Sequence, residues 1–121
     1  MTVLLVEDDP ECLESMVDLL EDERFAVARA QNSREALDYL ARHKDVELVV
    51  LDLMMPVMDG WHFVREQQRA AALASIPVLL VSAEAKLDQT AAELGVAGHL
   101  RKPLELDVFV ETVKKLRLAP G

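Results

Sequence analysis

The sequence predicts an α/β domain built on a doubly wound, five-stranded parallel sheet. Three short runs, at residues 3–6, 48–51 and 78–81, are apolar at every position, which is typical of strands buried on both faces of a parallel sheet. Between the runs lie segments whose apolar residues recur every three or four positions, as on one face of a helix. The β-α pair recurs five times along the chain, and such alternation with short connections favours right-handed crossovers between the strands.

The strands are expected to differ in burial. The three apolar runs should form the centre of the sheet. A segment at 25–30 carries Phe25, Val27 and Arg29 on one side and three alanines on the other, a pattern that indicates an edge strand. The fifth strand, at 97–100, is short.

The helices follow the strands in order. Three of them show a clear apolar stripe: Leu13, Val17 and Leu20 in the first; Ala36, Leu37, Leu40 and Ala41 in the second; Leu106, Phe109, Val110, Val113 and Leu116 in the last. The segments 61–72 and 86–94 have weaker stripes, but Gly95 follows the second of them, where helices commonly end.

The composition limits the possible functions. A chain of 121 residues predicts one domain, 1–121, with no output domain. The net charge of -9, without a block of Lys and Arg, argues against binding to nucleic acid or an anionic membrane. Cys12 is the only cysteine, and no apolar run approaches the roughly 20 residues needed to span a bilayer. We therefore expect a soluble, cytoplasmic protein.

Charged or hydroxyl-bearing residues follow four of the strands. Ligands of such sheets bind outside the carboxyl ends of the strands. The residues there are Glu7, Asp8 and Asp9 after the first strand, Asp52 after the third, Ser82 after the fourth, and Arg101, Lys102 and Pro103 after the fifth.

This set of residues predicts phosphoryl chemistry. Carboxylates packed together must hold a proton or a cation, and oxygen ligands suit Mg²⁺. A lysine and a hydroxyl beside the cation would bind phosphate oxygens. An aspartate can itself be the nucleophile and form an aspartyl-phosphate. We assign that role to Asp52, which stands alone at its strand end, and metal binding to Asp8 and Asp9.

Other interpretations remain open on these residues alone. Asp9 followed by Pro10 is also a typical helix start, and Ser82 could cap the next helix. A Mg²⁺ phosphohydrolase would use the same nucleophile, but such enzymes of the dehalogenase-like type place a second Asp two residues on, where this chain has Met54. A nucleotide- or flavin-binding domain would need a Gly-rich loop after the first strand, and none is present.

Four segments together resemble the receiver domain of two-component response regulators: VEDDP at 6–10, LDLMMPVMDG at 51–60, VSAE at 81–84 and LRKPL at 100–104. The resemblance covers nearly the whole chain and implies a flavodoxin-like strand order 2-1-3-4-5. It implies a signalling protein, not a conventional enzyme, in which Asp52 takes a phosphoryl group from a histidine kinase or histidine phosphotransfer protein with Mg²⁺ or Mn²⁺. An unphosphorylated scaffold is the alternative within this family.

The resemblance also implies roles for other residues. Asp8, Asp9 and Asp52 would bind the metal together with the backbone carbonyl of Met54. Ser82 and Lys102 would bind phosphoryl oxygens, and the bond before Pro103 would be cis.

A switch is implied as well. His99 occupies a switch position that is usually aromatic, and imidazole can titrate near neutrality. The surface of the fourth helix, fifth strand and fifth helix would change its affinity for a downstream protein. We expect a monomer or a weak dimer.

Overall fold

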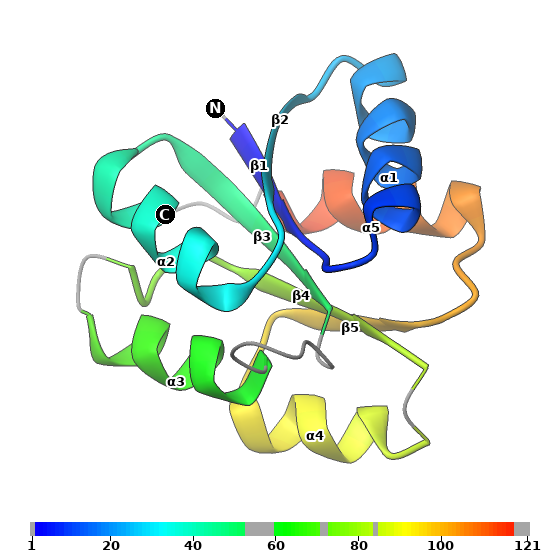
Figure 1. Cartoon of the computed structure of the whole chain (residues 1–121). Helices are drawn as coiled ribbons and strands as arrows, with labels where there is room; N and C mark the ends of the chain where they lie inside the picture. The colour runs from blue at the N-terminus through cyan, green and yellow to red at the C-terminus, as the bar shows by residue number, and fades with distance from the viewer. Residues whose placement is uncertain (1, 53–59, 71–72, 84, 118–121) are drawn as a thin grey trace.

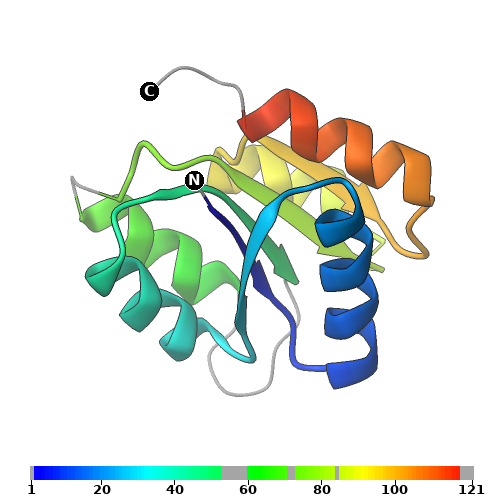
Figure 2. The same cartoon turned by 90° about the horizontal axis from the view of Figure 1, so that it is seen from above.

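The fold is a parallel sheet between two layers of helices (Figure 1). The computed structural model describes residues 2–52, 60–70, 73–83 and 85–117. Helices α1 and α5 cover one face of the sheet, and α2, α3 and α4 cover the other (Figures 1 and 2). The strands run in the order β2-β1-β3-β4-β5. The predicted fold class and strand order are confirmed.

Strands and helices alternate along the chain as predicted. The strands are β1 (Thr2–Val6), β2 (Ala26–Ala30), β3 (Val46–Asp52), β4 (Val78–Ser82) and β5 (Gly98–Arg101). The helices are α1 (Pro10–Asp22), α2 (Ser33–Arg42), α3 (Gly60–Arg69), α4 (Leu87–Leu94) and α5 (Leu106–Arg117). No helix in these described ranges is long and apolar enough to cross a membrane.

The central strands are buried on both faces, as their uninterrupted apolar sequences predict. Successive side chains of a strand point to opposite faces. Val3 and Leu5 therefore pack under α1 and α5 around Phe109, whereas Leu4 and Val6 pack under α2, α3 and α4 around Phe63. Two separate apolar clusters thus fix both helical layers to one sheet.

The register of the strands brings their carboxyl ends to one edge of the sheet. Val6 of β1 lies beside Leu51 of β3, and Asp52 follows directly, beside Val81 of β4. Ser82 lies beside Arg101 of β5. The polar residues that follow these strands are therefore neighbours in space.

Local signals set several helix ends. Asn32 caps α2, because its Oδ1 accepts a hydrogen bond from the Glu35 N–H at 2.9 Å, and Glu35 Oε1 accepts one from the Gln31 N–H. These two side chains thus accept hydrogen bonds from the N–H groups of Glu35 and Gln31, which have no acceptor within the helix. Helix α4 ends at Gly95, whose φ of 69° lies in the left-handed region that glycine adopts without steric cost.

Candidate functional site

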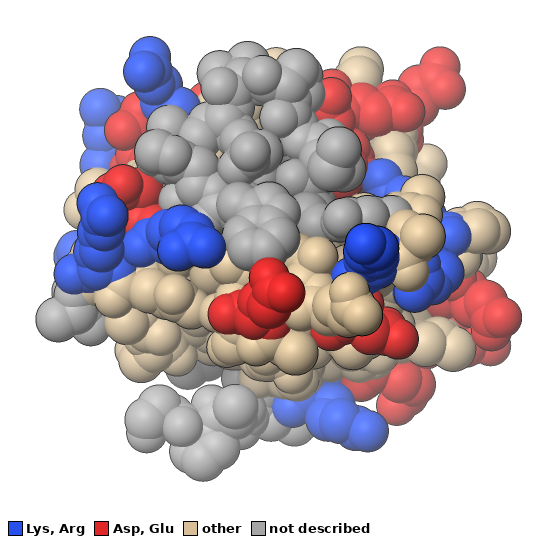
Figure 3. Space-filling view, turned by 90° about the horizontal axis from the view of Figure 1, so that it is seen from below, with Lys and Arg blue, Asp and Glu red and all other residues tan. Residues whose placement is uncertain are grey.

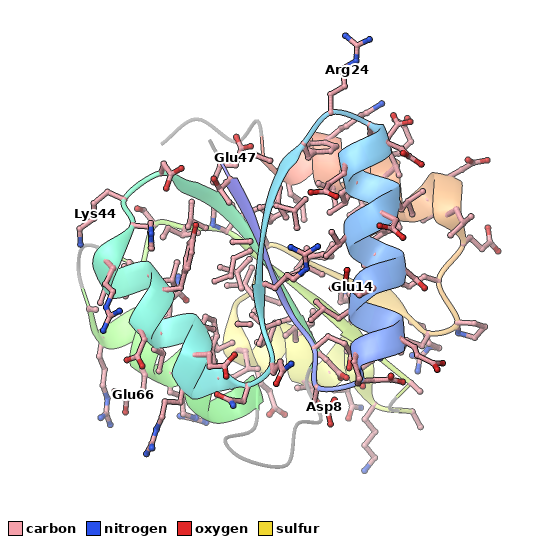
Figure 4. All side chains as sticks on the ribbon, turned by 45° about the horizontal axis from the view of Figure 1, so that its top comes forward. Asp8, Glu14, Arg24, Lys44, Glu47 and Glu66 are labelled. Carbon is pink, nitrogen blue, oxygen red and sulfur yellow. The ribbon has the colours of Figure 1, made fainter. Side chains whose placement is uncertain are left out.

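Three acidic side chains converge at the carboxyl edge of the sheet. Carboxylate oxygens of Glu7, Asp8 and Asp52 all lie within 4.8 Å of one another. Glu7 and Asp8 follow β1, and Asp52 is the last residue of β3. Figure 4 shows Asp8 where the chain leaves β1 for α1, at the end of the sheet opposite Glu47. Glu7 and Asp52 are buried and Asp8 is exposed, so the cluster opens to solvent on one side.

Lys102 provides the positive charge in this cluster. Its Nζ donates hydrogen bonds to Glu7 Oε1 at 2.8 Å and to Asp52 Oδ2 at 3.3 Å. The ammonium group therefore bridges two carboxylates that lie on different strands. Because Lys102 follows β5, this contact joins residues 95 positions apart in the sequence.

Burial and neighbouring charges shift the pKa values of Glu7 and Lys102. Burial raises the pKa of Glu7, and the Asp52 carboxylate raises it further, against the opposing effect of Lys102. Burial lowers the pKa of Lys102, but the hydrogen bond with Glu7 and the charge of Asp52 outweigh burial, so the pKa lies above its ordinary value. Lys102 stays charged at neutral pH. The cluster carries more acid than this one ammonium group neutralises.

Asp9, which the sequence interpretation assigned to the metal, lies outside this cluster. Its Oδ1 accepts a hydrogen bond from the Glu11 N–H at 3.0 Å, so Asp9 is the N-cap of α1 with Pro10 as the first helical residue. Its own backbone N–H approaches Glu7 Oε2 at 3.4 Å. The acids that lie with Asp52 in the described part of the chain are Glu7 and Asp8. The pairing of Asp9 with Pro10 was the available signal, because it commits the Asp9 side chain to the helix start.

Ser82 and Lys102 lie side by side. Ser82 is buried at the end of β4, and its backbone carbonyl accepts a hydrogen bond from the Lys102 N–H at 3.0 Å. The peptide bond between Lys102 and Pro103 is cis. The hydroxyl and the ammonium group thus leave adjacent strands at the same edge as Asp52.

His99 lies apart from the acidic cluster, and Met54 is not among the described residues. His99 is on β5, and its Nε2 lies 2.9 Å from Asp88 Oδ1 in α4, so it links a helix to the sheet. Met54 lies outside the described residues, and its expected carbonyl ligand is not tested.

The donor set fits a small divalent cation. Three carboxylates whose oxygens lie within 4.8 Å of one another supply oxygen ligands only, which is what Mg²⁺ and Mn²⁺ prefer. The excess negative charge beyond Lys102 gives a cation a favourable place to bind. The arrangement can therefore hold a metal ion beside Asp52, with a hydroxyl and an ammonium group nearby to bind anionic oxygens.

Comparison with known proteins points to one family. The profile of the "Response regulator receiver domain" matches residues 3–114. Response regulator Rre1 of Synechocystis sp. is 34% identical over 119 residues, covering 96% of this chain and 51% of Rre1. The polar-differentiation response regulator DivK of Brucella anthropi is 30% identical, with 93% of each chain covered. The chain thus spans about half of Rre1 and nearly all of DivK.

Solved structures show the same similarity. The receiver domain of a signal transduction histidine kinase from Syntrophus aciditrophicus superposes with a TM-score of 0.89 at 27% identity, covering 99% of this chain and 93% of that one. Chemotaxis protein CheY4 of Vibrio cholerae superposes with a TM-score of 0.87 at 26% identity, covering 95% and 97%. These relatives set aside the phosphohydrolase and nucleotide-binding alternatives.

Proposed function

The chain belongs to the response regulator receiver domain family of two-component signalling, and we propose that Asp52 is its phosphoacceptor. It is a signalling domain, not a conventional enzyme. One observation carries the proposal: Asp52 ends a central strand with its Oδ2 3.3 Å from Lys102 Nζ, inside an acidic cluster with Glu7 and Asp8. An aspartate placed so can act as a nucleophile whose product is held by neighbouring charges.

The proposed reaction is phosphoryl transfer from a phosphohistidine. An Asp52 carboxylate oxygen attacks phosphorus, the phosphorus–nitrogen bond breaks, and the released histidine nitrogen takes a proton from water. The product is an acyl phosphate on Asp52. Lys102 exchanges its bond with Asp52 for one with a phosphoryl oxygen, while the Ser82 hydroxyl donates to another.

The proposed metal ligands are Asp8 and Asp52, with Glu7 replacing Asp9 as the third acid of the site. A Mg²⁺ or Mn²⁺ ion held there would neutralise charge on the transferred group. The backbone carbonyl of Met54 remains a proposed fourth ligand. Glu7 would also position Lys102. Its Oε1 accepts a hydrogen bond from Lys102 Nζ at 2.8 Å, beside the position that the phosphoryl group would take.

A groove beside the site supports a protein phosphodonor. It has a volume of about 520 Å³, lies between α1 and the segment that leads into α5, and is lined by apolar side chains that include Met16, Leu104 and Phe109. Lys102, whose Nζ binds Asp52, also lines it, so the groove and the phosphoacceptor site share this residue. Leu106 on its border is 63% exposed, so its side chain is available for a protein contact. We assign the groove to a histidine kinase or histidine phosphotransfer protein.

A second protein contact is proposed on α4, β5 and α5. A shallow groove of about 500 Å³ crosses this surface, between Ala91 of α4 and Leu116 of α5. A downstream protein would bind there according to the phosphorylation state of Asp52. Acidic and basic side chains are interspersed on the lower face of the molecule (Figure 3), and we propose neither nucleic acid nor a membrane as a partner. A cytoplasmic location and a monomer or weak dimer are proposed as well.

The test is intact-mass spectrometry after incubation with a small phosphodonor, with and without Mg²⁺. The wild type should gain the mass of one phosphoryl group only with Mg²⁺, and Asp52→Asn should gain none. Asp38→Asn, an exposed acid on α2, is the matched control and should behave as the wild type. Absence of the gain with small donors and with phosphohistidine proteins would replace this proposal by the scaffold function.

A further inference from the structure

Asp88 links the first turn of α4 to the edge strand of the sheet. Its Oδ1 lies 2.9 Å from His99 Nε2 and 3.8 Å from an Arg101 guanidinium nitrogen. His99 and Arg101 are two positions apart on β5, so their side chains leave the same face of the strand. A neutral imidazole protonated on Nε2 or an imidazolium can donate the hydrogen bond to Asp88. One carboxylate of α4 thus contacts two donors of β5.

The two ends of α4 are held differently. At the carboxyl end, Gln68 Nε2 of α3 donates a hydrogen bond to the Leu94 carbonyl at 2.6 Å, and Gly95 terminates the helix with two backbone hydrogen bonds. At the amino end, Lys86 is the N-cap residue but makes no side-chain capping bond. The contact of Asp88 with β5 is therefore a principal polar restraint on the first turn, within the described part of the chain.

The position of this contact connects it to the phosphoacceptor site. Helix α4 follows the strand that ends at Ser82, and β5 ends just before Lys102. The contact is formed together with the bonds of Lys102 Nζ to Glu7 and Asp52, and transfer of a phosphoryl group to Asp52 would change the second of these bonds. An added phosphoryl group would draw Ser82 and Lys102 toward its oxygens. Because Ser82 precedes α4 and Lys102 follows β5, such a rearrangement would move the segments that carry Asp88 and its partners relative to one another.

We propose that Asp88 is a tether that favours the unphosphorylated arrangement of α4 against β5, an inference that rests on the proposed function. A ligand can shift a two-state equilibrium only by its difference in interaction with the two states. The tether is such a difference, because the interaction between Asp88 Oδ1 and His99 Nε2 at 2.9 Å weakens when the two groups separate. Removing the tether favours the phosphorylated arrangement.

The size of the effect follows from the exposure of the groups. The side chains of Asp88, Arg101 and His99 are 77%, 45% and 39% exposed, so solvent screens their attraction strongly. Exposed pairs of this kind change an equilibrium by a factor of about 2 to 5. The tether therefore shifts the equilibrium between the two arrangements of α4 and β5 by a small factor.

The experiment measures the affinity of the full chain for fluoroberyllate, a mimic of the phosphoryl group, by isothermal titration calorimetry with Mg²⁺. Asp88→Asn should bind fluoroberyllate about 2 to 5 times more tightly than the wild type. His99→Gln should give part of this gain, and the double variant should gain no more than Asp88→Asn. Glu93→Gln removes another exposed acid of α4 and should leave the affinity unchanged.

The outcomes separate this inference from the function on which it rests. Equal or weaker binding by Asp88→Asn, with normal binding by the wild type, would overturn the tether alone. An equal gain in Glu93→Gln would also overturn it, because the effect would then be one of net charge. If the wild type fails to bind fluoroberyllate, the proposed function fails, and the tether fails with it.

Discussion

Replacement of Asp52 by Asn should stabilise the protein in the absence of Mg²⁺. The substitution keeps the shape of the side chain and removes one charge from a buried acidic cluster. At 4.8 Å, the largest separation within the cluster, each of two like charges opposes Asp52 by about 3.5 kcal/mol at an effective dielectric constant of about 20. Lys102 at 3.3 Å attracts it by about 5 kcal/mol on the same scale.

The balance is a net repulsion that the amide relieves. Exposure of Asp8 screens part of the repulsion, whereas the lower cost of burying a neutral amide adds to the gain. We expect the free energy of unfolding to rise by about 1–2 kcal/mol in Asp52→Asn at neutral pH and low salt. Urea unfolding followed by circular dichroism measures it, with Asp38→Asn as the control for loss of an exposed charge.

The pH dependence provides an independent check. The folded state raises the pKa of Glu7 above its ordinary value of 4.5, so the folded protein binds that proton more tightly than the unfolded chain. The resulting stability is present below pH 4.5 and is lost as the pH rises through the folded pKa. Asp52→Asn removes one cause of the shift, so its advantage should grow with rising pH. A variant no more stable than the wild type without Mg²⁺, or one whose advantage is greatest in acid, would refute this reasoning.

Three further predictions concern single residues. Gly95→Ala should lower the free energy of unfolding by about 1 kcal/mol through backbone strain alone, since nothing lies within 4 Å of the added methyl group; unchanged stability in urea would contradict the left-handed helix end. Asn32→Ala should cost about 1 kcal/mol by removing the acceptor for the Glu35 N–H, and Asn32→Asp should restore it; equal unfolding midpoints for the two variants would argue against the cap. Burial and the charge of Glu7 raise the pKa of Cys12 to about 11, so its alkylation rate should keep rising up to that pH. A rate that levels off near the ordinary thiol value of 9, as in urea-unfolded protein, would contradict this.

Much of the fold could be predicted because the signals are local. Runs such as VLLV are apolar on both faces, so they predict central strands that helices cover on both sides. The helices between the strands then predict that the strands run parallel. The mixed sequence of 25–30 predicted an edge strand, and β2 lies at the edge. The boundaries were less accurate: β3 includes Asp52, and α3 ends at Arg69, short of the expected residue 72.

The acidic residues show where sequence reasoning was insufficient. Three consecutive acids follow β1, and their types do not say which of them face the phosphoacceptor. That choice depends on where the strand ends and the helix begins, and the helix start takes Asp9. The interpretation had paired Asp8 with Asp9, whereas the structure brings Glu7 and Asp8 to Asp52.

The sequence by itself determined the α/β architecture and the sheet edge at which Asp52, Ser82 and Lys102 lie, because hydrophobic periodicity and the rule for parallel strands act over a few residues. Only the tertiary structure decided that Lys102 bonds Glu7 across 95 positions, that Asp88 meets His99, and that Lys102 also lines an apolar groove beside α1. These contacts depend on distances between elements that are set by how the whole core packs. No local pattern of residues contains that information.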